Sequence, residues 1–295
     1  MDLLSHTTPL KLEDLRETLI RLEDTIIFGL VERAQFKHNS EIYTPGVTPF
    51  EDGFQGSFLD WFLKEIEQVH AKVRRYQSPD EYPFTSNLPE PILPQLEYSH
   101  ILHPNNVNVN DKIKSIYTKF VVPALCEAGD DSNHGSAATR DIECLQALSR
   151  RIHYGKFVAE SKFQDPKYHD KYVEMIKKGD RDAIMETLTN KAVEQKLLER
   201  LRLKVEVYGQ DLGKLSGTLN GSTGAVNGNG KTNGSHSPDH HALDVEKKLR
   251  VDKKLVVDLY EKYVIPLTKE VEVEYLLARL DGPNTPKLMS NNGQS

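Results

Sequence analysis

The chain has 295 residues, of which 28% are charged and 38% are hydrophobic, and its formal net charge is −6. These values are typical of an ordinary soluble protein, and they exclude the strongly basic surface of a nucleic-acid-binding protein. The sequence shows no basic amino-terminal segment followed by an apolar run and no stretch of the ~20 apolar residues that span a membrane, so we expect a cytoplasmic protein without a membrane partner.

The first helix is predicted over residues 11–34, where leucines recur at spacings of three and four. Arg16 borders this apolar seam, so it either turns toward a helix interface or stays on the surface like most arginines. Residues 38–56 follow as a connecting loop, because they are rich in glycine and proline and poor in helix formers.

A second helix is predicted from Ser57, because Ser57 and Asp60 form an approximate capping pair ahead of another apolar seam. This helix ends in the adjacent arginines Arg74 and Arg75. Two arginines at a helix carboxyl end are usually favourable partners of the helix dipole. Alternatively, they hold a carboxylate through parallel hydrogen bonds.

Residues 77–109 are rich in proline and have no sustained period, so they predict a long irregular segment that crosses the surface. A helix returns over residues 111–127, with a bend or stop at Pro123. Residues 128–136 are rich in glycine, aspartate, serine and asparagine, which predicts a turn.

The central element is one long helix predicted over residues 138–163, since its apolar residues follow the helical period without a proline. Ser136 or Thr139 is expected to cap it. Asp141 and Glu143 would then lie in its first turn, where the helix dipole favours carboxylates.

Arg151 and Lys162 are three helical turns apart in this prediction, and they therefore share a face. Gly155, Val158 and Ala159 lie between them and would form a floor of small residues between two positive charges. An anionic molecule could lie in such a trough. The alternative is a solvated cationic stripe.

Two short helices are predicted over residues 167–178 and 181–188, and a longer one then runs to Tyr208. Asn190 and Glu194 are four residues apart, so they are neighbours on one helical face. They either present a polar pair to a bound hydroxyl group or face solvent.

Residues 209–242 are dominated by glycine, asparagine, serine and threonine, which predicts a flexible insert. Its histidines have no partners at a helical spacing, so no metal site is expected there; they are His236, His240 and His241. The last helix is predicted over residues 244–280 with a kink at Pro266, and it places Thr268 and Glu272 on one face.

The two cysteines, Cys126 and Cys144, lie in partly apolar patterns without a metal-binding or redox spacing. We expect both to be buried free thiols. The length fits two domains or one large helical unit, and we interpret residues 1–295 as one all-α domain, a bundle of long amphipathic helices.

Residues 138–163 resemble the fungal and yeast type of chorismate mutase. The pair Leu15 and Arg16 and the run Ile-Pro-Leu-Thr-Lys-Glu-Val-Glu-Val-Glu-Tyr-Leu-Leu near the carboxyl end extend the resemblance. The resemblance implies an all-helical homodimer that rearranges chorismate to prephenate without a cofactor or a metal, on the branch toward phenylalanine and tyrosine. It implies that Arg16 and Arg151 bind the substrate carboxylates. It also implies that Lys162 and Glu272 address the ether oxygen, and that the pocket is completed by Asn190, Glu194 and Thr268.

The resemblance further implies regulation by two effectors, tyrosine as inhibitor and tryptophan as activator, at a dimer interface. The regulatory elements would lie in residues 37–56 and 77–136. The matching effector-binding positions are Arg74, Arg75, Asn133, Gly135, Ser136 and Thr139. Ser132 and His134 depart from the family pattern, which leaves the relative strength of the two effectors open.

Two other readings are compatible with the periodicity alone. A non-catalytic helical scaffold would carry all these polar residues on its surface. An aromatic amino-acid sensor would keep the effector site and lack catalysis. Consumption of chorismate by the purified protein separates both from an enzyme.

Overall fold

The computed structural model describes residues 10–96, 101–208 and 250–281, and within these ranges it contains helices and irregular segments but no strand. The all-α prediction is therefore confirmed. The α-helices in chain order are α1 (Leu12–Arg33), α2 (Phe58–Lys72), α3 (Asn110–Ile116), α4 (Val122–Leu125), α5 (His134–His153), α6 (Gly155–Gln164), α7 (His169–Lys178), α8 (Arg181–Leu188), α9 (Lys191–Tyr208), α11 (Lys253–Leu259) and α12 (Ile265–Leu277). Shorter turns are the 3₁₀ helices η1 (Ser40–Tyr43) and η2 (Arg75–Gln77) and the π-helices η3 (Tyr117–Val121) and η5 (Tyr260–Val264).

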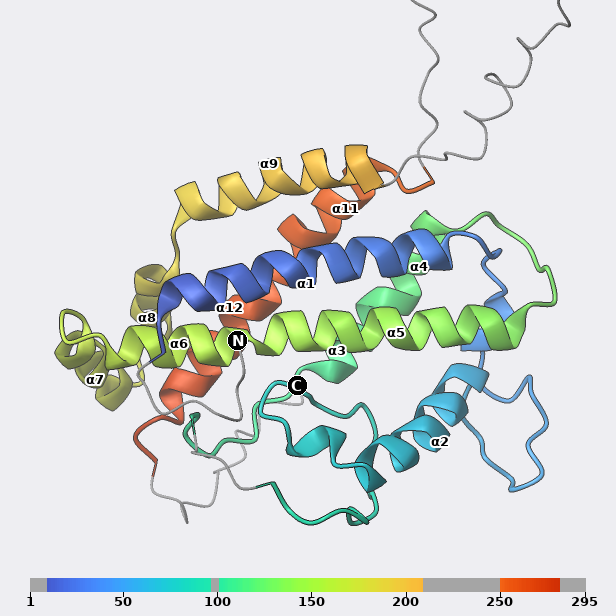
Figure 1. Ribbon diagram of the computed structural model, residues 1–295, viewed down its shortest axis with the longest axis horizontal. Coiled ribbons are helices and arrows are strands. Elements are labelled where there is room, and N and C mark those ends of the chain that lie inside the picture. Colours follow the sequence, from blue (N-terminus) through green and yellow to red (C-terminus); the bar gives the residue numbers. More distant parts are fainter. Residues whose placement is uncertain (1–9, 97–100, 209–249, 282–295) are drawn as a thin grey trace, which may run out of the picture.

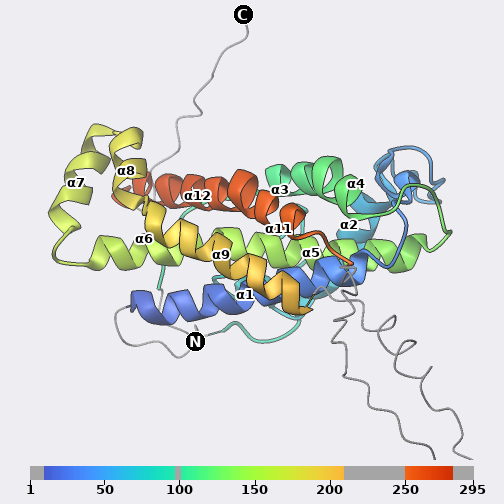
Figure 2. The same cartoon turned by 90° about the horizontal axis from the view of Figure 1, so that it is seen from above.

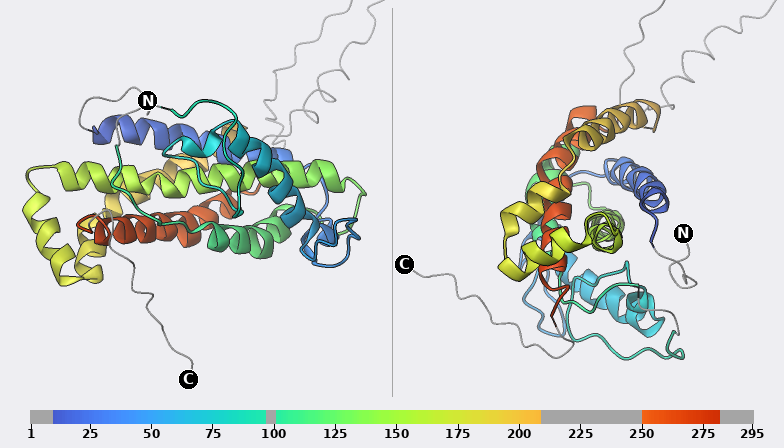
Figure 3. Two further views of the ribbon diagram at one scale, coloured as in Figure 1. Left: turned by 90° about the horizontal axis from the view of Figure 1, so that it is seen from below. Right: turned by 90° about the vertical axis from the view of Figure 1, so that its left-hand side faces the viewer.

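The centre of the fold is the antiparallel pair of α1 and α5 (Figure 1). Helix α6 extends α5. Helices α11 and α12 run alongside α5 and α6, and α7 and α8 lie at one end of the molecule (Figure 2). The end-on view in Figure 3 shows α9 and α2 on opposite sides of the central pair. One large buried cluster of aliphatic and aromatic side chains joins α1, α2, α5, α9, α11 and α12.

Helix α5 differs from its prediction at its start. It begins at His134, so Asp141 lies in the third turn rather than the first. The Asp141 carboxylate is buried and accepts hydrogen bonds from Arg33 Nε at 2.7 Å, Tyr43 Oη at 2.7 Å and Tyr117 Oη at 2.9 Å. This carboxylate therefore joins α5 to α1, η1 and η3 instead of interacting with the helix dipole.

The caps were predicted with mixed success. Ser57 and Asp60 form a complete capping box at the start of α2, as predicted. Neither Ser136 nor Thr139 caps α5, because Asn133 occupies the N-cap position. The Thr139 hydroxyl instead donates to the carbonyl of Gly135, inside the helix, at 2.8 Å.

The predicted single helix over residues 138–163 is divided at Tyr154, which separates α5 from α6. The backbone there tightens toward a 3₁₀ turn, since the Tyr154 carbonyl accepts from the amides of both Phe157 at 3.1 Å and Val158 at 3.4 Å. The direction of the helix is nevertheless maintained, so that α5 and α6 together form the long central rod (Figure 1).

Both predicted proline irregularities are π turns rather than simple kinks. Helix α4 carries Pro123 in its first turn directly after η3, and α12 carries Pro266 in its first turn directly after η5. Proline has no amide hydrogen to donate, so the turn before it loses a regular helical bond and can widen. The last helix is described from Lys253 to Leu277, and residues 244–249 of its predicted span lie outside the described residues.

The proline-rich segment at 77–109 is irregular where it is described, as predicted. A buried carboxylate on α2 holds it, because Glu67 accepts hydrogen bonds from the amides of Phe84 and Thr85 and from the Thr85 hydroxyl. Such bonds satisfy backbone groups that no regular structure satisfies. The segment is therefore fixed on the α2 side of the central pair.

Both cysteines are buried free thiols, as predicted. Burial raises the pKa of Cys126 to about 11 and that of Cys144 to about 12. The predicted insert at 209–242, with its three histidines, lies outside the described residues. Among the helices that are described, none combines the length and the apolar character needed to cross a membrane.

Candidate active site

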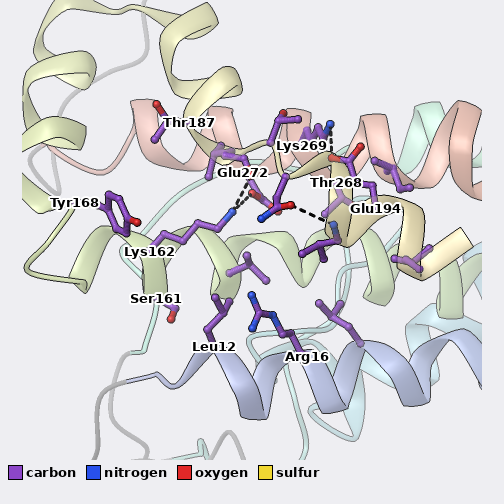
Figure 4. A pocket seen from close by; sticks show the side chains of 18 of the residues that line it. Leu12, Arg16, Ser161, Lys162, Tyr168, Thr187, Glu194, Thr268, Lys269 and Glu272 are labelled. Carbon is purple, nitrogen blue, oxygen red and sulfur yellow. Dashed lines mark hydrogen bonds and ion pairs between the residues drawn. The ribbon is translucent and has the colours of Figure 1, made fainter. Parts of the chain in front are cut away.

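A pocket of about 430 Å³ opens between α1, the α5–α6 rod, α9 and α12 (Figure 4). Its volume is within the range of small-molecule sites. All seven residues that the sequence predicted as catalytic line it: Arg16, Arg151, Lys162, Asn190, Glu194, Thr268 and Glu272. Sequence positions that are more than 250 residues apart therefore meet in one cavity.

Arg151, on the last turn of α5, is only 4% exposed, so its charge faces the pocket rather than bulk solvent. Its Nη1 donates a long hydrogen bond to Thr268 Oγ1 at 3.5 Å, and its guanidinium lies 5.9 Å from the centre of the Tyr260 ring. Its Nε is buried and has no hydrogen-bond partner in the described part of the chain. An unpaired donor on a buried guanidinium is costly unless an anion binds it.

Arg16 supplies a second cation from α1, on the side of the pocket across from Thr268 and Glu272 (Figure 4). It is exposed, and within the described ranges no hydrogen bond or ion pair holds its guanidinium. Its five donors are therefore free to bind a carboxylate at the mouth of the pocket.

Lys162, on α6, and Glu272, on α12, approach each other across the pocket with Nζ and Oε2 3.6 Å apart. Lys162 also donates to the carbonyl of Leu188 at 3.1 Å, which fixes its ammonium group between α6 and the end of α8. Glu272 is buried, and this burial raises the pKa of its carboxyl group above the usual value, although Lys162 and then Arg151 act in the opposite direction.

Glu194, on α9, is paired with Lys269 of α12, with their charged atoms 2.7 Å apart. Asn190 precedes α9, and its side-chain oxygen accepts from the amide of Val193 at 3.1 Å. The asparagine therefore fixes the start of the helix that carries Glu194.

The predicted floor of small residues is only partly correct. Val158 lines the pocket, but Ala159 is buried in the apolar cluster beneath α7 and α8. Gly155 instead allows α12 to approach closely, since a Cβ added there would lie 3.0 Å from Thr268 Cγ2 and 3.1 Å from Glu272 Cγ. The glycine therefore positions the two α12 residues and does not itself line the cavity.

Comparison with known proteins accounts for this arrangement. The family model of chorismate mutase type II matches residues 133–273. The chorismate mutase of Trichoderma parareesei is 46% identical over 289 residues, which cover 95% of this chain and 97% of the relative. The chain belongs to the chorismate mutase family. It is accordingly an isomerase.

Solved chorismate mutases have the same fold. The Candida albicans enzyme in complex with L-Trp is 40% identical, with a TM-score of 0.81 over 95% of this chain and 96% of the other. The enzyme AtCM1 with tyrosine bound in its allosteric site is 42% identical, with a TM-score of 0.74 over 94% of this chain and 99% of the other.

Sequence reasoning missed several residues that line the pocket of this chorismate mutase. Lys269 had a usable signal, since it follows Thr268 directly and lies three residues before Glu272 on the same helix. The others come mainly from the chain around α7 and α8, where no spacing relates them to the predicted site. They include Ser161, Asp165, Tyr168, Tyr172, Thr187 and Thr189.

The predicted effector positions of the chorismate mutase fall into two groups. Arg75 contacts Glu81 and Gln146, and Arg74, whose φ is +67°, donates to the carbonyl of Pro94. The second group lies at the start of α5 and is largely exposed: Asn133, Gly135, Ser136 and Thr139. No hydrogen bond or ion pair of the described residues joins the two groups. Gln146 is seven residues beyond Thr139, which is about 10 Å along a helix.

Proposed function

We propose that this chorismate mutase binds chorismate in the pocket and rearranges it to prephenate with the seven predicted residues. The observation that carries the proposal is that the buried Nε of Arg151 and the guanidinium of Arg16, which line the same pocket, have no partner among the described residues. Chorismate carries two carboxylates, and each arginine can bind one through parallel hydrogen bonds. Unpaired inward-facing cations of this kind argue against a scaffold.

The chemistry needs no nucleophile, because the rearrangement is a pericyclic shift within one molecule. Catalysis comes from holding a compact conformer and from stabilising charge on the breaking ether bond. Lys162 supplies a compact positive charge to the ether oxygen. Glu272 donates a hydrogen bond to the same oxygen in its protonated form, which burial favours.

Three further residues complete the pocket in this proposal. Thr268 lies beside Arg151 and supports the carboxylate bound there. Glu194, held by its ion pair with Lys269, accepts a hydrogen bond from the substrate hydroxyl. Asn190 keeps the helix of Glu194 in place and offers its amide group at the pocket edge.

The test is the loss of ultraviolet absorbance of chorismate with the purified protein, together with identification of prephenate as product. Arg151→Ala should lower kcat/KM by about 100-fold or more, as expected for removal of a preorganised charged donor. Arg140→Ala is the matched control, since Arg140 is on the same helix but pairs with Glu143 at the surface. Equal activity in all three proteins would refute the assignment of this pocket.

The cellular role we propose is the branch step toward phenylalanine and tyrosine, carried out by a cytoplasmic homodimer. The dimer is supported by exposed apolar side chains on α2, at its C-cap and in the crossing segment: Val69, Val73, Ile92 and Leu93. Light scattering at the assay concentration should give twice the chain mass of 33.5 kDa. A monomeric mass would contradict the dimer and leave the catalytic proposal standing.

We also propose that tyrosine inhibits and tryptophan activates the enzyme, through Arg74, Arg75 and the polar start of α5. Relatives crystallised with L-Trp, and with tyrosine in an allosteric site, support amino-acid effectors. Arg75→Ala should abolish the response to tyrosine and leave unregulated turnover measurable, because Arg75 lies outside the pocket. Equal loss of basal turnover and regulation would place Arg75 in the fold or the active site instead.

A further inference from the structure

Asp80, in the crossing segment, is a buried carboxylate outside the pocket. It is 1% exposed, and its Oδ2 accepts a hydrogen bond from Arg150 Nε at 2.7 Å and forms an ion pair with Nη2 of the same guanidinium at 2.6 Å. The Ser78 hydroxyl donates to the other oxygen. Arg150 directly precedes Arg151, so Asp80 holds the helical turn that carries the buried cation of the pocket.

Glu81, the next residue, binds Arg75, one of the two arginines predicted to bind the effector. Its Oε2 accepts from Arg75 Nε at 3.2 Å and from Nη2 at 3.1 Å. Arg75 Nη1 donates in addition to Gln146 on α5 at 2.9 Å. An internal carboxylate therefore already occupies the guanidinium face that an effector carboxylate would use.

The two contacts reach the same face of α5. Gln146 and Arg150 are four residues apart, so they are neighbours on the helix surface. Arg75 contacts the first and Asp80 contacts the second, while the dipeptide of Asp80 and Glu81 joins the two contacts covalently. A displacement of Arg75 can therefore reach the last turn of α5, which carries Arg151, through a short and continuous series of contacts.

We propose that an effector carboxylate displaces Glu81 from Arg75, and that the displacement is transmitted through Asp80 to Arg150 and the catalytic turn of α5. This inference rests on the proposed effector role of Arg75. Glu81 is a suitable group to displace, because burial raises the pKa of its carboxyl group and its ionised form is already disfavoured in place. Asp80 is a positioning residue, since it acts on the pocket only through α5.

The experiment measures tyrosine binding by calorimetry and tyrosine inhibition by the chorismate assay in the full chain. Glu81→Gln removes the competing charge, so the Kd for tyrosine should fall by about fivefold to tenfold. Asp80→Asn and Arg150→Gln each break the ion pair between Asp80 and Arg150, the first at its buried partner and the second at its exposed partner. Both should bind tyrosine with a Kd within about threefold of the parent, while inhibition at saturating tyrosine falls by at least about threefold.

The control is Glu143→Gln, which neutralises an exposed carboxylate on the same helix that forms an ion pair with Arg140. It should match the parent in both measurements. If Arg150→Gln binds tyrosine and is inhibited as strongly as the parent, or if it loses binding and inhibition together, the proposed coupling is wrong. If the parent itself binds no tyrosine, the proposed regulation fails, and this inference fails with it.

Discussion

The pH dependence of turnover tests the role of Glu272 directly. Only the protonated carboxyl group can donate a hydrogen bond to the ether oxygen, whereas the ionised group would oppose the negative charge that develops there. Burial raises the pKa of Glu272, so the donor persists to a higher pH than in an ordinary glutamate. Turnover should therefore fall as the pH rises through this raised pKa.

The size of the fall in turnover also follows from the titration of the Glu272 carboxyl group. Above the pKa, each pH unit lowers the protonated fraction about tenfold. Loss of one preorganised donor is worth about 100-fold, so the decline should level off after about two pH units. Glu272→Gln keeps a donor at every pH and should hold its activity across the range in which the parent declines.

The assay is kcat from the loss of chorismate absorbance, measured upward from about pH 4, which is near the ordinary pKa of a glutamate, to about pH 9. Glu274→Gln is the control, because Glu274 is two residues further along α12 and pairs with Arg181 at the surface. Its pH profile should match that of the parent. If the parent and Glu272→Gln decline along the same curve, Glu272 is not the titrating donor.

Three other changes test the packing that supports the site. Gly155→Ala should lower kcat/KM by about tenfold or more, since its Cβ would lie 3.0 Å from Thr268 and push α12 away from the pocket. Arg33→Met should lower the free energy of unfolding by about 3–5 kcal/mol in chemical denaturation, because it leaves the buried Asp141 carboxylate without its cation. Deletion of residues 213–238 should leave Tm and basal turnover nearly unchanged, since their composition offers little apolar surface to bury.

Each of these tests has an outcome that contradicts it. Gly135→Ala places a Cβ where no atom lies within 4 Å, so a fall in kcat/KM as large as that of Gly155→Ala would show that the effect is not steric. Arg140→Met removes an exposed ion pair and should cost at most about 1 kcal/mol. A similar loss for Arg33→Met would show that the buried network contributes little. A large fall in Tm on deletion of 213–238 would show that this segment is packed.

The sequence determined the helices because helical periodicity and turn residues are local signals. The period of leucines predicted α1, and Ser57 with Asp60 predicted the start of α2, which the capping box confirms. Likewise, the prediction of two short helices left residues 179 and 180 between them, and Gly179 ends the first helix with a left-handed φ of 64°. Each of these features is decided within a few residues of chain.

The membership of the pocket also came from the sequence, but through resemblance rather than periodicity. Without the resemblance, spacing and composition favoured the surface for Arg16, Asn190 and Glu194. Only the packing of α1, α9 and α12 around the α5–α6 rod brings them together. Their roles in catalysis stay predictions that the experiments above address.

Tertiary structure alone decided the environment of individual side chains. The sequence predicts that Asp141 interacts with the helix dipole. In the structure it is buried and forms an ion pair with Arg33, which is 108 positions away. The sequence predicts Gly155 as part of a trough floor, yet it allows α12 to approach the rod closely at Thr268 and Glu272. Burial and long-range pairing depend on which helices meet, and that is a property of the whole packed core that no local pattern contains.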